Sequence, residues 1–119
     1  MFLTLNHQNL DAYRLARKVL LYCYAITRDY PPEEKFSMVQ QIRRSALSVV
    51  LNIAEGASRK SAIERRRFFE IARGSLVEID AAFDVAADLN YAGADVMEKM
   101  REPFIRCFQT LSKLTTAGH

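Results

Sequence analysis

The chain of 119 residues has few helix-interrupting residues and no long apolar run. Glycine occurs four times and proline three times, so few positions force the backbone to turn. No apolar run approaches the roughly 18 residues that a membrane span requires. The first residues also lack the charged flank and apolar stretch of a signal peptide. We therefore expect a cytoplasmic protein without a membrane partner.

Cysteine and histidine are also scarce, with two of each. Cys23 and Cys107 suit a reducing compartment and cannot supply the four thiolates of a structural zinc site. His7 and His119 lie near the chain ends, and neither belongs to the Glu-x-x-His pairs that di-iron bundles use. The glycines are isolated from one another, which excludes a glycine-rich phosphate loop. The sequence thus predicts no catalytic, cofactor-binding or metal-binding residues, and we expect a protein that is not an enzyme.

Hydrophobic residues make up 50% of the chain and charged residues 26%, which is the balance of a soluble globular domain. The length fits one domain. We expect it to span residues 1–119, with short flexible ends at about residues 1–8 and 116–119. The formal net charge of +3 is by itself weak evidence for any partner.

Two helices are predicted in the first half of the chain, because apolar residues there recur at steps of three and four. The first covers about residues 9–29 and is stopped by Pro31 and Pro32, which lack the amide donor. The second begins after Ser37, a candidate N-cap, and ends at Gly56. The expected core positions are Ala12, Leu15, Val19, Cys23 and Ile26 in the first helix and Met38, Ile42, Ala46, Val49 and Ile53 in the second.

Two further helices are predicted in the second half. Ser61 with Glu64 three residues later has the form of a capping box and opens the third helix. Asp95 starts the fourth, and Pro103 either kinks that helix or marks its first turn. The expected core stripes are Phe68, Ala72, Leu76, Ile79, Phe83 and Ala86 in the third helix and Met97, Met100, Phe104, Phe108 and Leu111 in the fourth. Four such helices with short connections favour an all-α, antiparallel, up-down-up-down four-helix bundle.

The first two helices carry more apolar surface than a single buried stripe requires. The second helix is apolar almost all round over residues 46–54. Every helix of a small bundle has an outer face, so we expect another copy of the chain to cover this surplus. The alternative is a monomer in which Leu47, Val50 and Leu51 are scattered exposed residues. The first helix contributes a second apolar seam, which consists of Leu10, Tyr13, Ala16, Leu20 and Tyr24.

A narrow polar line crosses the apolar second helix and consists of Gln41, Arg44, Ser48, Asn52 and Glu55. On the third helix, Glu78 lies on one face with Gly74, and this glycine indicates a close helix crossing. If the two helices turn back between them, Arg43 and Arg44 reach the height of Glu78, and we expect an ion pair there. The interpretation is a structural polar network of Arg43, Arg44, Asn52, Glu55 and Glu78. Catalysis that depends on Glu55 and Glu78 is the alternative.

The sequence of the predicted second and third helices and the turn between them is similar to that of a known family. The matching residues are the runs 41–46 and 52–56, Arg59, Phe69, the runs 71–72 and 74–75, and Glu78, with further likeness from Tyr13 to about Tyr91. This pattern resembles the four helix bundle protein family, also called the 23S rRNA intervening-sequence protein family. The resemblance implies an antiparallel bundle that assembles as a homopentameric ring. It also implies a non-enzymatic protein for which nucleic acid is a conjectured partner.

Charge is unevenly distributed along the chain. Residues 43–73 contain eight basic and three acidic residues, whereas residues 78–102 contain seven acidic and two basic residues. Arginine side chains and a helix N-terminus both favour phosphate, so the basic turn is the candidate nucleic-acid contact. Its candidate residues are Arg59, Lys60, Arg65 and Arg66. In a ring this turn would repeat as a basic belt. The sequence therefore leaves two functions open, an oligomeric scaffold and a protein that binds RNA or DNA.

Overall fold

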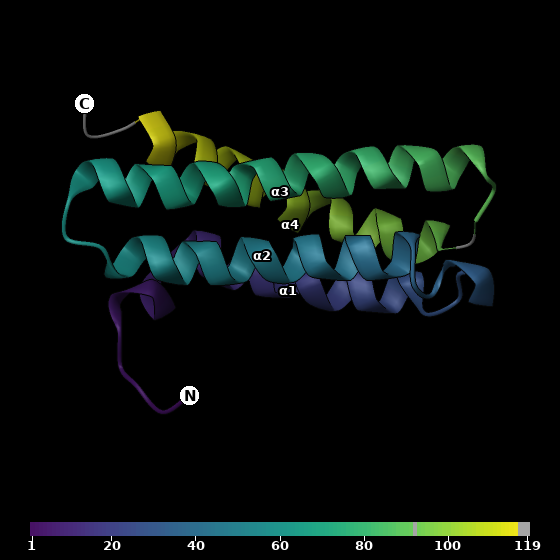
Figure 1. Cartoon of the computed structure of the whole chain (residues 1–119), viewed down its shortest axis with the longest axis horizontal. Coiled ribbons are helices and arrows are strands. Elements are labelled where there is room, and N and C mark those ends of the chain that lie inside the picture. The colour runs from purple at the N-terminus through teal and green to yellow at the C-terminus, as the bar shows by residue number, and fades with distance from the viewer. Residues whose placement is uncertain (92, 117–119) are drawn as a thin grey trace.

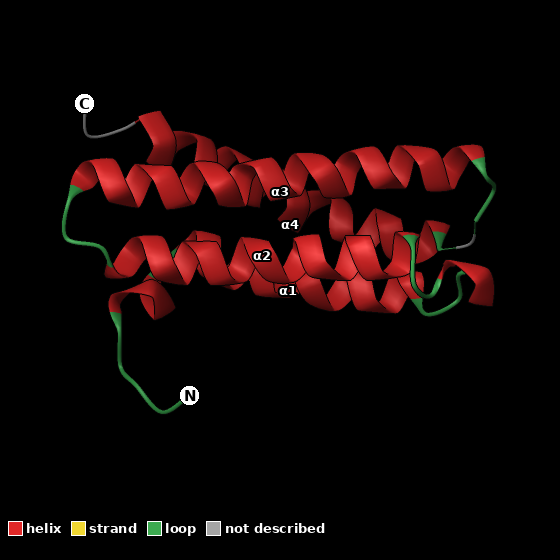
Figure 2. Ribbon diagram, viewed as in Figure 1, coloured by secondary structure: helices red, strands yellow, loops and turns green. Residues whose placement is uncertain are grey.

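The computed structural model describes residues 1–91 and 93–116, and it is all-α over this part of the chain, with no strand (Figure 2). The four predicted helices are confirmed, and the residues 117–119, which include His119, lie outside the described part. Two short 3-10 helices, η1 (Asn6–Asn9) and η2 (Pro32–Glu34), accompany the four α-helices. The α-helices are α1 (Asp11–Thr27), α2 (Met38–Ser58), α3 (Ala62–Asp88) and α4 (Ala94–Thr116).

Each α-helix packs lengthwise against two others, in the cyclic order α1, α2, α3, α4 and back to α1. The connection between α2 and α3 lies at one end of the molecule, and the other two connections lie at the opposite end (Figure 1). The molecule is an elongated body of 43 × 31 × 24 Å. No helix in the described residues is long and apolar enough to cross a membrane.

The core lies along the bundle axis and follows the predicted stripes closely. Phe68 is the exception, because it is not among the described residues that pack against the core and its neighbour Phe69 takes the core position. Met38, Met97, Phe104 and Phe108 are partly buried and pack against the core. The predicted positions that are buried are Ala12, Leu15, Val19, Cys23, Ile26, Ile42, Ala46, Val49, Ile53, Ala72, Leu76, Ile79, Phe83, Ala86, Met100 and Leu111.

The structure differs from the sequence predictions at Gly56 and Gly74, and it excludes one of the two alternatives for Pro103. Gly56 does not end α2, which continues to Ser58; instead Gly56 is buried where α2 meets the ring of Phe69. The predicted close crossing at Gly74 is wrong, since a Cβ at this exposed position would meet no atom within 4 Å. Pro103 lies inside α4, so it does not mark the first turn of that helix.

The second seam of α1 is covered mainly by the chain itself. Leu10, Tyr13 and Leu20 are partly buried against the core, and Ala16 is fully buried. The reason is that α1 has two neighbours, α2 and α4, and needs one apolar seam for each. Val50 is likewise only 7% exposed within one copy. The apolar surplus predicted from the sequence is therefore smaller than expected and is confined to fewer side chains.

A contact between two connections closes one end of the bundle. The hydroxyl of Tyr91, which follows α3, donates a hydrogen bond to a carboxylate oxygen of Glu34 in η2. The ring of Tyr91 also lies 5.1 Å from that of Tyr30. Gly93 adopts a positive φ of 119° beside Ile26, a conformation that favours glycine. The α3–α4 connection is thereby fixed on the end of α1.

Candidate functional site

A seam of polar side chains runs between α2 and α3, where the sequence predicts a polar network. Gln41 donates a hydrogen bond of 3.0 Å to the hydroxyl of Ser45 and one of 3.4 Å to the Glu78 carboxylate. Ser45 itself donates to the same carboxylate at 3.3 Å. Glu78 of α3 thus accepts from two residues of α2, and both donors are neutral.

The seam continues one helical turn further along α2. Ser75 of α3 donates to the hydroxyl of Ser48 at 3.0 Å. The amide of Asn52 donates to the backbone carbonyl and the hydroxyl of Ser48, at 2.9 and 3.0 Å. Because hydrogen bonds require specific distances, these contacts favour one lengthwise position of α2 against α3. Ser45 and Ser75 belong to this seam, although the sequence analysis did not select them.

The predicted ion pair between Glu78 and Arg43 or Arg44 is wrong. Arg43 turns to the opposite side of α2, where its Nε donates to the Thr27 hydroxyl of α1 at 3.0 Å. Its guanidinium also lies 4.4 Å from the centroid of the Tyr24 ring. Arg44 is exposed and forms no ion pair within the described residues. Consecutive helical residues point about 100° apart, so the two arginines lie on different sides of α2. Arg44 borders a hollow with Ala82 and Val85 of α3, one turn beyond Glu78, and does not pair with that carboxylate.

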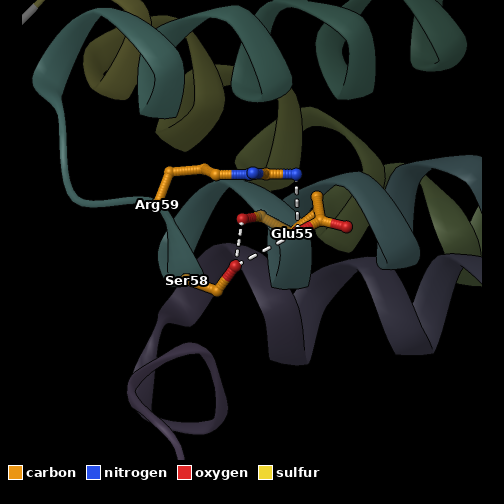
Figure 3. A network of polar contacts seen from close by, with 3 residues as sticks. All are labelled: Glu55, Ser58 and Arg59. Carbon is orange, nitrogen blue, oxygen red and sulfur yellow. Dashed lines mark hydrogen bonds and ion pairs between the residues drawn. The ribbon is translucent and has the colours of Figure 1, made fainter.

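The end of α2 carries its own small network, shown in Figure 3. The Glu55 carboxylate accepts from the Arg59 guanidinium at 3.2 Å and from the Ser58 hydroxyl at 3.2 Å. Arg59 also lies over the ring of Phe68, 4.9 Å from its centroid. Glu55 therefore holds the basic turn to the end of α2 and does not reach Glu78, so the two carboxylates predicted together lie in separate contacts.

The four residues predicted to bind nucleic acid differ in their surroundings. Arg65 donates to the backbone carbonyls of Arg59 and Lys60, at 3.0 and 2.7 Å, and so braces the turn. Arg66 is half-buried, and its Nε has no hydrogen-bond partner among the described residues. Lys60 is exposed. Two of the four, Arg59 and Arg65, therefore have contacts that the turn itself requires.

A further arginine contacts a neighbouring helix and was not selected by the sequence analysis. Arg73 of α3 donates from Nε to the Ser112 hydroxyl of α4 at 2.8 Å. Its guanidinium lies 4.4 Å from the centroid of the Phe108 ring. Arg73 thus connects α3 to the last part of α4. No sequence signal distinguishes it from the neighbouring surface arginines, since its role depends on which helix lies alongside.

The two cysteines are buried in the core and are not joined to each other. Burial raises the pKa of the Cys23 and Cys107 thiols to about 12. Both therefore stay protonated near neutral pH, and a protonated thiol is a poor nucleophile and metal ligand. Over residues 1–91 and 93–116, no group of three or more His, Cys, Asp and Glu side chains is placed to hold a metal ion.

Over the described residues the fold is all-α with four α-helices. Hydrogen bonds from neutral side chains, two of them to the Glu78 carboxylate, connect α2 and α3. The chain belongs to the 23S rRNA-intervening sequence protein family, whose model matches residues 8–113. This match confirms the family resemblance drawn from the sequence. The same family region contains the whole seam and the basic turn. A comparison with curated proteins found no match.

Proposed function

We propose that this protein is a non-enzymatic, cytoplasmic, self-assembling scaffold. Its unit is an antiparallel up-down-up-down four-helix bundle, and the assembly is a homopentameric ring. The observation that supports assembly is the set of large apolar side chains that one copy leaves uncovered on α1 and α2. Leu21 is 70% exposed, Leu51 is 56% exposed and Leu47 is 42% exposed. Leu47 also shares a hollow with Tyr24 of α1. Exposed apolar surface that extends over two helices is typical of protein interfaces.

Family membership supports the number five, because the resemblance of the sequence implies a ring of that size. The polar seam supports a structural rather than a catalytic role for Glu78. A general acid or base has to meet a substrate, but this carboxylate already accepts hydrogen bonds from Gln41 and Ser45. The Glu55 carboxylate is likewise paired with Arg59.

Light scattering coupled to size-exclusion chromatography tests this proposal. The expected particle has five times the chain mass of 13.6 kDa and keeps that mass on dilution into the micromolar range. A stable species of the single-chain mass at that concentration overturns the proposed assembly.

A second candidate function, the binding of RNA or DNA, is favoured by the uncompensated charge of the basic turn. Of the basic residues at the turn and the start of α3, only Arg59 forms an ion pair within the described part of the chain. Lys60 and Arg67 are exposed there. A ring would present this turn once per copy, which favours multivalent contact with a phosphate backbone.

A further inference from the structure

A groove runs along the α3–α4 pair, which is the least extensively packed of the four neighbouring helix pairs. It consists of two adjoining hollows of about 310 and 250 Å³, which share Asp80, Phe104 and Ile105. The lining is apolar along its centre, where Phe104 and Phe108 are half-buried and Val77 and Ile105 are exposed. One copy therefore leaves apolar surface of α3 and α4 open to solvent.

Carboxylates line the rim of this groove. Asp80 and Asp84 come from α3, and Glu98 comes from α4. Within the described residues Asp80 and Asp84 form no ion pair, and Glu98 has only an exposed contact of 3.6 Å with Arg101. Arg101 is the one basic residue among the described lining residues, so three carboxylates against one guanidinium make the groove acidic as well as apolar.

The outward side of α1 has the opposite charge. Five residues at steps of three, four, three and four share this side, and all five are exposed. Three of them are arginines, and the two apolar members lie between them. We call this line the α1 ridge; it consists of Arg14, Arg17, Leu21, Tyr24 and Arg28. One acidic residue, Asp11, adjoins its first end and forms an exposed contact of 3.4 Å with Arg14; Arg17 and Arg28 form no ion pair within the described residues.

We propose that the α1 ridge of one copy lies in the α3–α4 groove of the next copy. This inference rests on the proposed self-assembly and names the two surfaces that meet. Leu21 and Tyr24 would cover the apolar centre around Ile105, and the arginines would neutralise the unpaired carboxylates Asp80 and Asp84. A helix that lays apolar anchors into a groove is a common mode of recognition, and charge complementarity fixes its partner and direction.

The contact has to form between copies. Within one chain α1 packs against α2 and α4, and the ridge borders both: Tyr24 lies beside Arg43 of α2, and Leu21 lines a hollow with Pro103 of α4. Because α1 has no contact with α3, the ridge does not face the α3–α4 groove of its own copy. Since ridge and groove are different surfaces, the contact is heterologous, and each copy can bind one neighbour on each of its two surfaces. Such contacts build a ring when the rotation between copies closes.

Two single substitutions separate the surfaces. Leu21→Asp places a charge in the apolar part of the ridge and leaves the groove unchanged. Ile105→Asp places a charge in the apolar centre of the groove and leaves the ridge unchanged. Both side chains are exposed within one copy, so neither change disturbs the core. By light scattering, each variant alone is expected to have the mass of a single chain, with the helical circular dichroism of the wild type. Their equimolar mixture is expected to contain a two-chain species, because each pair keeps one intact ridge and one intact groove.

The control is Ile63→Asp, an exposed position at the start of α3 outside both surfaces, and it should assemble as the wild type does. A second pair, Arg17→Glu and Asp84→Arg, changes only exposed charges and so guards against misfolding. Each of these is expected to weaken assembly alone, and their mixture is expected to restore assemblies larger than two chains.

The outcomes distinguish this inference from the proposed function. A wild type with the mass of one chain overturns the assembly itself. A wild type that assembles while Leu21→Asp and Ile105→Asp also assemble overturns the ridge and groove and leaves the scaffold standing. The ridge and groove are equally overturned if the mixture contains no two-chain species at the highest concentration tested, or if Ile63→Asp dissociates as readily as the other two.

Discussion

Gly56 of α2 lies against the ring of Phe69 of α3, so closely that a Cβ on Gly56 would be 2.8 Å from Cε1 of Phe69. Phe69 is buried and cannot swing away freely. We expect Gly56→Ala to lower the free energy of unfolding by about 1 kcal/mol. Overpacking costs about 1–3 kcal/mol, and the better helix propensity of alanine returns about 1 kcal/mol of it. Urea denaturation followed by circular dichroism measures the difference.

Gly74 provides the matched control for this prediction. It also lies inside a helix, but a Cβ there would have no neighbour within 4 Å. Gly74→Ala should therefore raise the free energy of unfolding by about 0.5–1 kcal/mol through helix propensity alone. Equal effects of the two substitutions would contradict the close approach at Gly56.

The helices and the core were predictable because both follow from periodicity. Apolar residues at steps of three and four mark the buried side of a helix whatever its neighbours are, and Ile42, Val49 and Ile53 are completely buried as predicted. The two glycines show the limit. A glycine inside a helix suggests that a neighbouring helix approaches closely at that position. The sequence does not give the relative positions of α2 and α3, which place the close approach at Gly56 and not at Gly74.

The Glu78 carboxylate accepts hydrogen bonds from Ser45 and Gln41 and forms no ion pair with Arg44 in the described residues. A double-mutant cycle of Glu78→Gln and Ser45→Ala should therefore give a coupling energy of about 0.5 kcal/mol, the lower end for a hydrogen bond. The low value is expected because Glu78 is exposed and the bond of 3.3 Å is long. Urea denaturation of the four proteins at equal concentration supplies the data.

Arg44 provides the control cycle. Arg44→Ala with Glu78→Gln should show effects that add within about 0.3–0.5 kcal/mol, because the two side chains share no contact. A coupling energy between Arg44 and Glu78 well above this range, together with none between Ser45 and Glu78, would support the ion pair that the sequence predicts.

The sequence could not predict the directions in which the side chains of Arg43 and Arg44 point, for a simple geometric reason. Heights along two antiparallel helices can be estimated from the rise per residue, and Ser45 and Glu78 do lie at the same level, close to the predicted one. The rotation of α2 about its axis cannot be obtained in this way. That rotation turns Arg43 toward Thr27 of α1 and leaves the neutral side chains Gln41 and Ser45 to face Glu78.

Tyr91 should make the folded state sensitive to alkaline pH. Its hydrogen bond to Glu34, together with burial and nearby negative charge, raises the pKa of the Tyr91 hydroxyl from 10.0 to about 12. A proton held more tightly by the folded state stabilises it below the unfolded pKa, and this contribution is lost as the pH rises toward 12. We expect the free energy of unfolding to fall between pH 10 and pH 12, measured by urea denaturation at each pH.

Tyr91→Phe removes the hydroxyl and should give a flatter pH profile over the same interval. Its stability at neutral pH should be lower than that of the wild type, because the link to Glu34 is absent. Some alkaline loss should persist in this variant, since burial also raises the pKa of the Tyr30 hydroxyl and of the Cys23 and Cys107 thiols. Identical profiles for wild type and variant would show that Tyr91 is not the group responsible.

The basic turn calls for different variants from those that the sequence suggests. Arg65 braces the turn through the carbonyls of Arg59 and Lys60, so Arg65→Ala would alter the loop as well as its charge. Arg59 is paired with Glu55. Lys60 and Arg67 are exposed, and their replacement changes charge with little effect on the turn.

We therefore expect Lys60→Ala with Arg67→Ala to weaken any binding of RNA or DNA without changing the fold. If these side chains bind phosphates, the slope of log affinity against log salt should fall by roughly 1 for each phosphate that is no longer bound. Fluorescence anisotropy with short single- and double-stranded oligonucleotides at several salt concentrations measures the slope. Lys99→Ala with Lys113→Ala, which also removes two exposed positive charges but from α4, is the charge-matched control and should keep the wild-type slope. A wild type that binds no oligonucleotide even at low salt would remove nucleic acid as a partner and leave the scaffold role alone.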